Sequence, residues 1–124
     1  SHSDSTLLEF NQGTFVDAHR SVGYMKAGTS LCVAPVSGPG LEGAVQYWAV
    51  GKDCCAARGN FACGDSDDAA TLSAVTISDG EEDYRSAVRM AESVYELTPL
   101  GTAPVLVRWT SNATAYKDAL WTSA

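Results

Sequence analysis

The sequence predicts an α+β domain: a mainly antiparallel sheet with one long amphipathic helix, at about 81–97, packed on a face, and two disulfides. Three observations predict this class. Several β-rich segments precede the helix without regular strand–helix alternation. Only one segment repeats apolar residues clearly at three and four positions. Four cysteines, an even number, occur in 124 residues. We expect 1–124 to form a single domain, with 1–5 as a tag remnant or flexible start.

β-branched and aromatic residues mark the expected strands, at about 22–26, 29–36, 44–50, 71–78 and 104–110. Ala27 and Gly28 predict a turn between the first two. The segment 44–50 has apolar residues on both faces, which favours a central strand covered on both sides. Pro35 cannot donate to a ladder, so we expect it at a sheet edge or at the end of its strand.

The helix has recognisable start and stop signals. Ser78 or Asp79 can cap its first amide groups, and the acidic residues that follow favour the positive end of the helix dipole. Apolar residues then recur up to Leu97, and Pro99 ends the pattern. The segment 112–124 predicts one or two closing helical turns.

The charge of the chain excludes some classes of partner. Fifteen acidic residues outnumber eight basic ones, which gives a formal net charge of −7, and the basic residues form no run. A phosphate backbone requires clustered positive charge, so we expect no nucleic-acid partner. No stretch approaches the roughly 20 apolar residues of a membrane helix. We therefore expect no direct membrane insertion within this chain.

The cysteines Cys32, Cys54, Cys55 and Cys63 predict two disulfides. A bond between the neighbours Cys54 and Cys55 would force a strained small ring. Cys32 is therefore expected to bond one of this pair and Cys63 the other, and the sequence leaves both pairings open. Zinc sites prefer cysteines two to four residues apart, so we expect no metal and no cofactor.

An oxidising compartment follows from the same cysteines, so the predicted location is secreted, luminal or extracellular. Asn112 begins an Asn-Ala-Thr glycosylation sequon. For calcium, an EF-hand pattern from Asp65 would require Gly and Glu where Ala70 and Thr76 stand. A solvated acidic loop is therefore expected there.

No catalytic residue is predicted. The chain has no nucleophile-elbow motif, no dinucleotide or phosphate loop, and only His2 and His19 to assist a cysteine nucleophile. Aromatic residues along the strands are expected to fill the core rather than a ligand groove.

The segment 51–68, here called the cysteine loop, is the predicted binding surface, because rigid loops on a scaffold commonly carry recognition. The residues expected to contact a partner are Lys52, Asp53, Arg58, Asn60, Phe61 and Asp65. The expected function is an extracytoplasmic binding or assembly module for a protein partner. The alternatives are an accessory subunit of a larger membrane protein assembly, and a hydrolase or metal-dependent enzyme with an unrecognised site.

The pattern YWAVGKDCC(x₇)CGD, with TFVDAHRSVGYMKAGTSLCVAPV before it and YRSAVRMAE and PVLVRW after it, also carries a resemblance. It resembles an uncharacterised family of cysteine-containing luminal or extracellular domains from protist, alveolate-type, membrane-associated proteins. The resemblance spans about 14–109. It implies a compartment and an architecture but no catalytic residue.

Overall fold

A computed structural model of the protein describes residues 6–78 and 81–111. Its elements are β1 (Leu7–Glu9), β2 (Phe15–Val16), the 3₁₀ helix η2 (Ala18–Arg20), β3 (Val22–Lys26), β4 (Thr29–Ser37), β5 (Ala44–Val45), β6 (Tyr47–Lys52), β7 (Ser73–Thr76), α1 (Glu81–Tyr95), β8 (Thr98–Pro99) and β9 (Val105–Trp109). The predicted α+β class with two disulfides is confirmed. The expected start at 1–5, the sequon at Asn112 and the closing helical turns lie outside the described residues.

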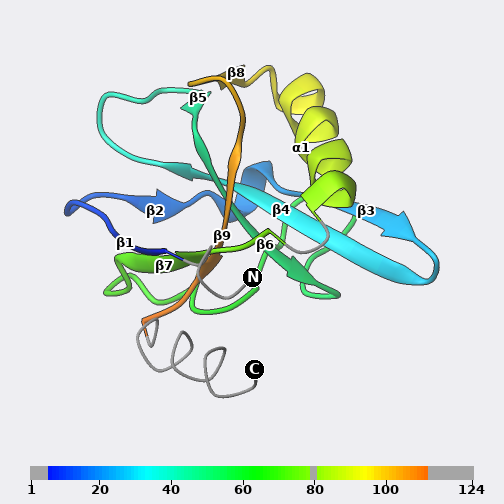
Figure 1. The fold of residues 1–124 in the computed structure, drawn as a ribbon, viewed down its shortest axis with the longest axis horizontal. Helices are drawn as coiled ribbons and strands as arrows, with labels where there is room; N and C mark the ends of the chain where they lie inside the picture. Colours follow the sequence, from blue (N-terminus) through cyan, green and yellow to red (C-terminus); the bar gives the residue numbers. More distant parts are fainter. Residues whose placement is uncertain (1–5, 79–80, 112–124) are drawn as a thin grey trace.

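Seven strands form the main sheet, in the order β1-β7-β9-β6-β4-β2, with β3 also paired to β4. Every neighbouring pair in it is antiparallel except β6 and β9, which run parallel. A separate parallel pair joins β5 and β8. Helix α1 packs over β3 and β4, on one face of the sheet (Figure 1). The predicted arrangement of one helix on a mainly antiparallel sheet is therefore confirmed.

Strands β3 and β4 form a hairpin, as the turn signal predicts. Ala27 and Gly28 connect them with φ of 52° and 82°, and Lys26 pairs with Thr29 across the turn. Two consecutive positive φ values are what a two-residue I′ turn requires, since this turn matches the twist of the strands. The hairpin brings β3 alongside the strand that carries Cys32.

Pro35 does not end its strand, because β4 continues to Ser37 and Pro35 pairs with Trp48 of β6. Its carbonyl accepts a hydrogen bond from the Asp17 N–H on the other side of the strand, at 2.9 Å. The nitrogen of a strand residue points to the same side as its carbonyl. On that side β2 has ended at Val16 and β3 begins only at Val22. The missing N–H therefore falls in the gap between two neighbouring strands.

The expected strand at 44–50 is two strands, β5 and β6, separated at Gln46. β5 leaves the main sheet to pair with β8. β6 is central, as predicted, because it lies between β4 and β9. Its alternate residues enter the two cores: Trp48 packs on the helix side and Ala49 on the other.

Helix α1 ends at Tyr95, two residues before the expected position. Glu96 adopts φ of 54°, and the Leu97 N–H donates to the Glu92 carbonyl at 2.9 Å. This is the Schellman arrangement, in which a left-handed residue ends the helix and the next apolar side chain turns inward. Leu97 is buried, whereas Met90, which continues the apolar repeat, is exposed.

Two polar contacts hold α1 against the β3 side of the sheet. The Lys26 ammonium donates to the Asp83 carboxylate in the first turn of the helix, and this bond raises the pKa of Lys26. Near the other end, the Tyr95 hydroxyl donates to the Ser21 carbonyl at 2.8 Å. The helix is therefore attached at both ends to the segment that enters and leaves β3.

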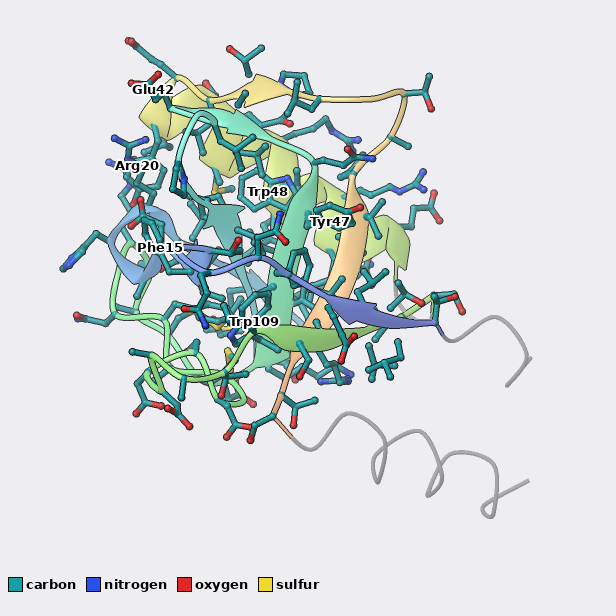
Figure 2. The ribbon with its side chains drawn as sticks, turned by 90° about the vertical axis from the view of Figure 1, so that its left-hand side faces the viewer. Phe15, Arg20, Glu42, Tyr47, Trp48 and Trp109 are labelled. Atoms are coloured by element: carbon teal, nitrogen blue, oxygen red, sulfur yellow. A yellow bond between two sulfur atoms is a disulfide. The ribbon has the colours of Figure 1, made fainter. Side chains whose placement is uncertain are left out.

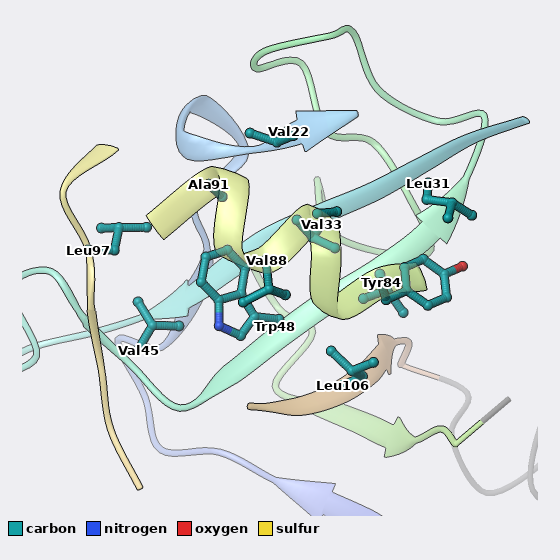
Figure 3. Packing of buried hydrophobic residues seen from close by; sticks show 12 residues of the cluster. Val22, Leu31, Val33, Val45, Trp48, Tyr84, Val88, Ala91, Leu97 and Leu106 are labelled. Carbon is teal, nitrogen blue, oxygen red and sulfur yellow. The ribbon is translucent and has the colours of Figure 1, made fainter. Parts of the chain in front are cut away.

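The buried residues form one cluster on each face of the sheet. The helix-side cluster contains Val22, Leu31, Val33, Val45, Trp48, Val50, Tyr84, Ala87, Val88, Ala91, Leu97 and Leu106. Figure 3 shows Trp48 of this cluster between α1 and the strands, close to Val88 and Val45. The second cluster contains Val16, Cys32, Ala34, Val36, Ala49, Phe61, Cys63, Ala74, Val107 and Trp109. The disulfides therefore belong to the core of the face opposite the helix.

Aromatic rings on that opposite face pack on one another. Phe10 contacts Tyr47 edge-on, with ring centroids 5.3 Å apart, and lies 5.0 Å from the ring of Trp109. Tyr47 and Trp109 lie in front of the sheet in Figure 2, with α1 behind it. The edge-on contact of Phe10 with Tyr47 suits the ring quadrupoles. The expectation that strand aromatics fill the core is met by Trp48 and Trp109, which are 0% and 2% exposed.

Candidate functional site: a corner fixed by two disulfides

The two disulfides are Cys32–Cys55 and Cys54–Cys63, with Cα atoms 6.0 and 5.2 Å apart. The adjacent cysteines thus bond to different partners, as predicted, and the pairing that the sequence left open is determined. The sulfur atoms of Cys32, Cys54 and Cys63 all lie within 4.8 Å of one another. The two bridges are therefore packed together on one spot of the sheet.

Glycine occupies the position opposite Cys32 on both neighbouring strands. Gly23 of β3 and Gly51 of β6 are its register partners. A Cβ on Gly23 would lie 2.9 Å from the Cys55 sulfur, and a Cβ on Gly51 would lie 2.7 Å from the Cys54 and Cys63 sulfurs. Real Cβ atoms do not approach so closely, so the two glycines provide the room for the bridges.

Backbone hydrogen bonds attach the first part of the cysteine loop to the sheet. Asp53 closes a two-way contact with Ser30: its N–H donates to the Ser30 carbonyl at 2.8 Å, and its carboxylate accepts the Ser30 N–H at 2.9 Å. Further along, the Gly23 N–H donates to the Ala57 carbonyl at 2.9 Å. The Gly59 N–H donates to the Ser21 carbonyl at 3.0 Å. The loop therefore runs along the start of β3 rather than extending into solvent.

Asp65 attaches the second part of the loop to the end of β9. Its carboxylate accepts the Ser111 N–H at 2.8 Å and the Ser111 and Thr110 hydroxyls at 3.1 Å each. The Ser111 N–H, chiefly, holds the pKa of Asp65 below its usual value. The Asp65 N–H also donates to the Trp109 carbonyl, at 2.9 Å. Gly64, at φ 59°, allows this approach, because a Cβ there would lie 2.2 Å from that carbonyl oxygen.

Of the six residues predicted to bind a partner, three have exposed side chains that are available for contact. These are Lys52, Arg58 and Asn60. Asp53 and Asp65 lie in the same loop, but their carboxylates are used by Ser30 and by the end of β9. The two carboxylates therefore hold the loop in place.

Phe61 is placed differently from the expectation. Its side chain is only 4% exposed and belongs to the core cluster that contains both disulfides. The Phe61 N–H also donates to the Ala18 carbonyl of η2, at 3.4 Å. From the sequence, an aromatic residue between two cysteines of a loop is expected to contact a partner. In the fold it is the apolar contact that anchors the loop to the sheet.

A cavity of about 410 Å³ opens beside the Cys54–Cys63 bridge. β6 contributes Val50, Gly51 and Lys52 to its lining, β9 and the residue after it contribute Arg108, Trp109 and Thr110, and the loop contributes Cys54, Ala62, Cys63 and Gly64. Sequence reasoning identified Lys52 but missed Arg108. No sequence signal singles out Arg108, because only the pairing of β6 with β9 brings it to the corner. Gly23 and Gly51 could have indicated the position of the disulfides, since glycine inside a strand marks close packing.

The sulfur cluster also bears on the metal-dependent alternative. Cys32, Cys54 and Cys63 are close enough to ligate one ion. Cysteine binds metals as the thiolate, and all three sulfurs here are in disulfides. As long as the bridges are intact, these residues do not fit a metal site.

Fold and site together define an α+β domain whose cysteine loop is fixed to one face of a mixed sheet. No family model, curated protein or solved structure matches the chain. Within residues 6–78 and 81–111, no helix has the length and apolar character needed to cross a membrane.

Proposed function

We propose that the protein is an extracytoplasmic binding or assembly module that presents the cysteine loop to a protein partner. One observation carries the proposal: the loop is fixed at many points, yet its outward side chains have no role in holding it. Two disulfides and the contacts of Asp53 and Asp65 fix its backbone. Arg58 and Asn60 are exposed between these points.

A fixed loop is suited to recognition because the cost of ordering it is met during folding rather than on binding. The outward surface of residues 56–62 combines small side chains with one cation and one amide. Its exposed members are Ala56, Ala57, Arg58, Asn60 and Ala62. Small residues let a partner approach the backbone closely, while Arg58 and Asn60 supply directed hydrogen bonds.

The proposal includes an oxidising compartment, with which two disulfides are compatible. It also includes glycosylation at Asn112 and the resemblance to luminal or extracellular domains of protist membrane-associated proteins. The accessory-subunit alternative differs only in the partner, which would then be a membrane protein assembly. No observation in the described part of the chain favours the hydrolase alternative.

A photo-crosslinking experiment tests the proposal. A benzophenone amino acid at Ala57 is exposed to secreted proteins and, separately, to solubilised membrane proteins of the source cells. The matched control carries the same group at Ser93, on the exposed side of α1. We expect a discrete adduct from the loop position alone, reduced by Arg58→Glu but not by Arg89→Glu on the helix. The fraction that yields the adduct separates a soluble partner from a membrane assembly.

Equal adducts from positions 57 and 93, or none from either fraction, would rule out the loop as the recognition surface. Each variant is first checked for absence of free thiols, so that loss of a disulfide is not mistaken for loss of partner binding. An adduct that Arg58→Glu leaves unchanged would also count against the proposal.

A further inference from the structure

We propose that the cavity between the ends of β6 and β9 binds an oxyanion: a carboxylate, phosphate or sulfate, either free or as a group of a larger ligand. This site goes beyond the proposed function, because its lining shares only Ala62 with the outward surface of residues 56–62 and it requires no protein partner. Three observations carry it: two cations with no partner among the described residues, the hydrogen bonds that hold the neighbouring carboxylates, and the separation of β6 from β9.

The cavity arises where two paired strands separate. The parallel ladder between β6 and β9 ends at the pair Ala49–Val107. Beyond it, β6 continues in register with β4 up to Lys52, and β9 continues with β7 up to Trp109. Each strand is therefore held by its other neighbour while the space between them opens. The cysteine loop, through Cys63 and Gly64, closes one end of this space.

Lys52 and Arg108, one from each strand, belong to the lining of this space. In the part of the chain that the structure describes, neither side chain forms an ion pair or a hydrogen bond, and no acidic residue belongs to the lining. This is unusual for a chain with net charge −7. Two cations that share a cavity repel each other, and a bound anion converts that repulsion into attraction.

The nearest acids in the sequence do not neutralise these cations. Asp53, next to Lys52, accepts the Ser30 N–H. Asp65, next to Gly64, accepts the Ser111 N–H and the hydroxyls around it. Both carboxylates are thus committed to fixing the loop. Within the described residues, Lys52 and Arg108 therefore form no ion pair with a carboxylate.

The chemistry of the lining fits an oxyanion. Arginine presents a planar fork of donors that matches two oxygen atoms, and lysine adds a mobile ammonium. Val50, Trp109 and the Cys54–Cys63 bridge make the remaining lining largely apolar, which strengthens charge attraction. Gly51 and Gly64 add no side chains that would fill the space.

Titration followed by ¹⁵N–¹H NMR tests the site on the intact domain. Sodium phosphate and sodium acetate are added in separate arms, with chloride exchanged to keep the ionic strength constant. We expect saturable shifts at the amides of Gly51 and Gly64, at the Trp109 indole and at the Arg108 Nε–H. The arm that saturates at the lower concentration indicates whether the anion is tetrahedral or planar.

The variant Lys52→Gln/Arg108→Gln should weaken this binding at least tenfold. The control variant Arg58→Gln/Arg89→Gln has the same net charge but alters no lining residue, and it should bind as the unmodified chain does. Shifts that stay linear, or that fall equally in both variants, would show charge screening only and would overturn the site. If the unmodified loop gives no adduct from position 57 while anion binding is normal, the proposed function alone is refuted.

Discussion

Gly51 lies directly opposite Cys32 in the β4–β6 ladder, and the space of its missing side chain is taken by the Cys54–Cys63 bridge. A Cβ at this position would lie 2.6 Å from the Cys63 Cβ. The Cys32–Cys55 bridge thus starts from β4, and the Cys54–Cys63 bridge lies over Gly51 on the neighbouring strand. The Cys54–Cys63 bridge can pack on the sheet because Gly51 has no side chain.

Gly51→Ala should destabilise the domain by about 1–3 kcal/mol, because overpacking at a rigid contact moves backbone or bridge. Urea unfolding with the disulfides intact measures this. Gly38→Ala is the matched control, since the nearest atom to its new Cβ, the Thr14 Cα, is 3.5 Å away. The control should lie within about 0.5 kcal/mol of the unmodified chain. Equal stability of the two variants would contradict the packing described for Gly51.

Removing the bridges singly should cost similar amounts of stability. The Cys32–Cys55 bridge has a sequence separation of 23 and Cys54–Cys63 one of 9. Loop-closure entropy then gives about 3.4 kcal/mol for the first and about 2.6 kcal/mol for the second. Paired Cys→Ser variants measured by urea unfolding test these values. Cys54→Ser/Cys63→Ser should also contain no free thiol, and two reactive thiols in it would contradict the pairing.

Asp65 should make the stability of the domain depend on pH in the acid range. Its pKa is lower in the folded chain than the ordinary value of about 3.9. Its contribution is therefore fully present above the unfolded pKa and is lost as the pH falls through the folded pKa. The urea midpoint should decline below about pH 4, and Asp65→Asn should remove part of that decline. Asp67→Asn, an exposed acid in the same loop, is the control and should leave the profile unchanged.

Tyr95→Phe should destabilise the domain by about 1 kcal/mol, because the Ser21 carbonyl loses a donor. That carbonyl also accepts the Gly59 N–H, so hydrogen exchange at Gly59 should quicken as well. Tyr24→Phe is the control, since in the described residues the Tyr24 hydroxyl forms no hydrogen bond. Unchanged exchange at Gly59 in Tyr95→Phe would show that helix and loop are not linked through Ser21.

Local patterns predicted the fold well where one kind of interaction dominates. The apolar repeat identified α1, and the parity and adjacency of the cysteines restricted the bridges to two pairings. Pro35 misled because its effect depends on which strands flank it, and β2 and β3 leave a gap there. Phe61 misled because burial of a loop residue depends on the sheet beneath it. Arg108 could not be found at all, since it joins Lys52 only through the pairing of strands far apart in the sequence.

The closeness of the Cys32, Cys54 and Cys63 sulfurs has a consequence for how the protein acquires its bonds. A thiolate released at Cys54 or Cys63 lies within 4.8 Å of a sulfur of the other bridge, so the two bridges can exchange partners by thiol attack with only local movement. Exchange to the other allowed pairing would shift the chain at Cys54 and Cys55 by one residue. In the native pairing Phe61 is packed in the same buried cluster as Cys32 and Cys63, so a one-residue shift next to it would have to be accommodated by that cluster.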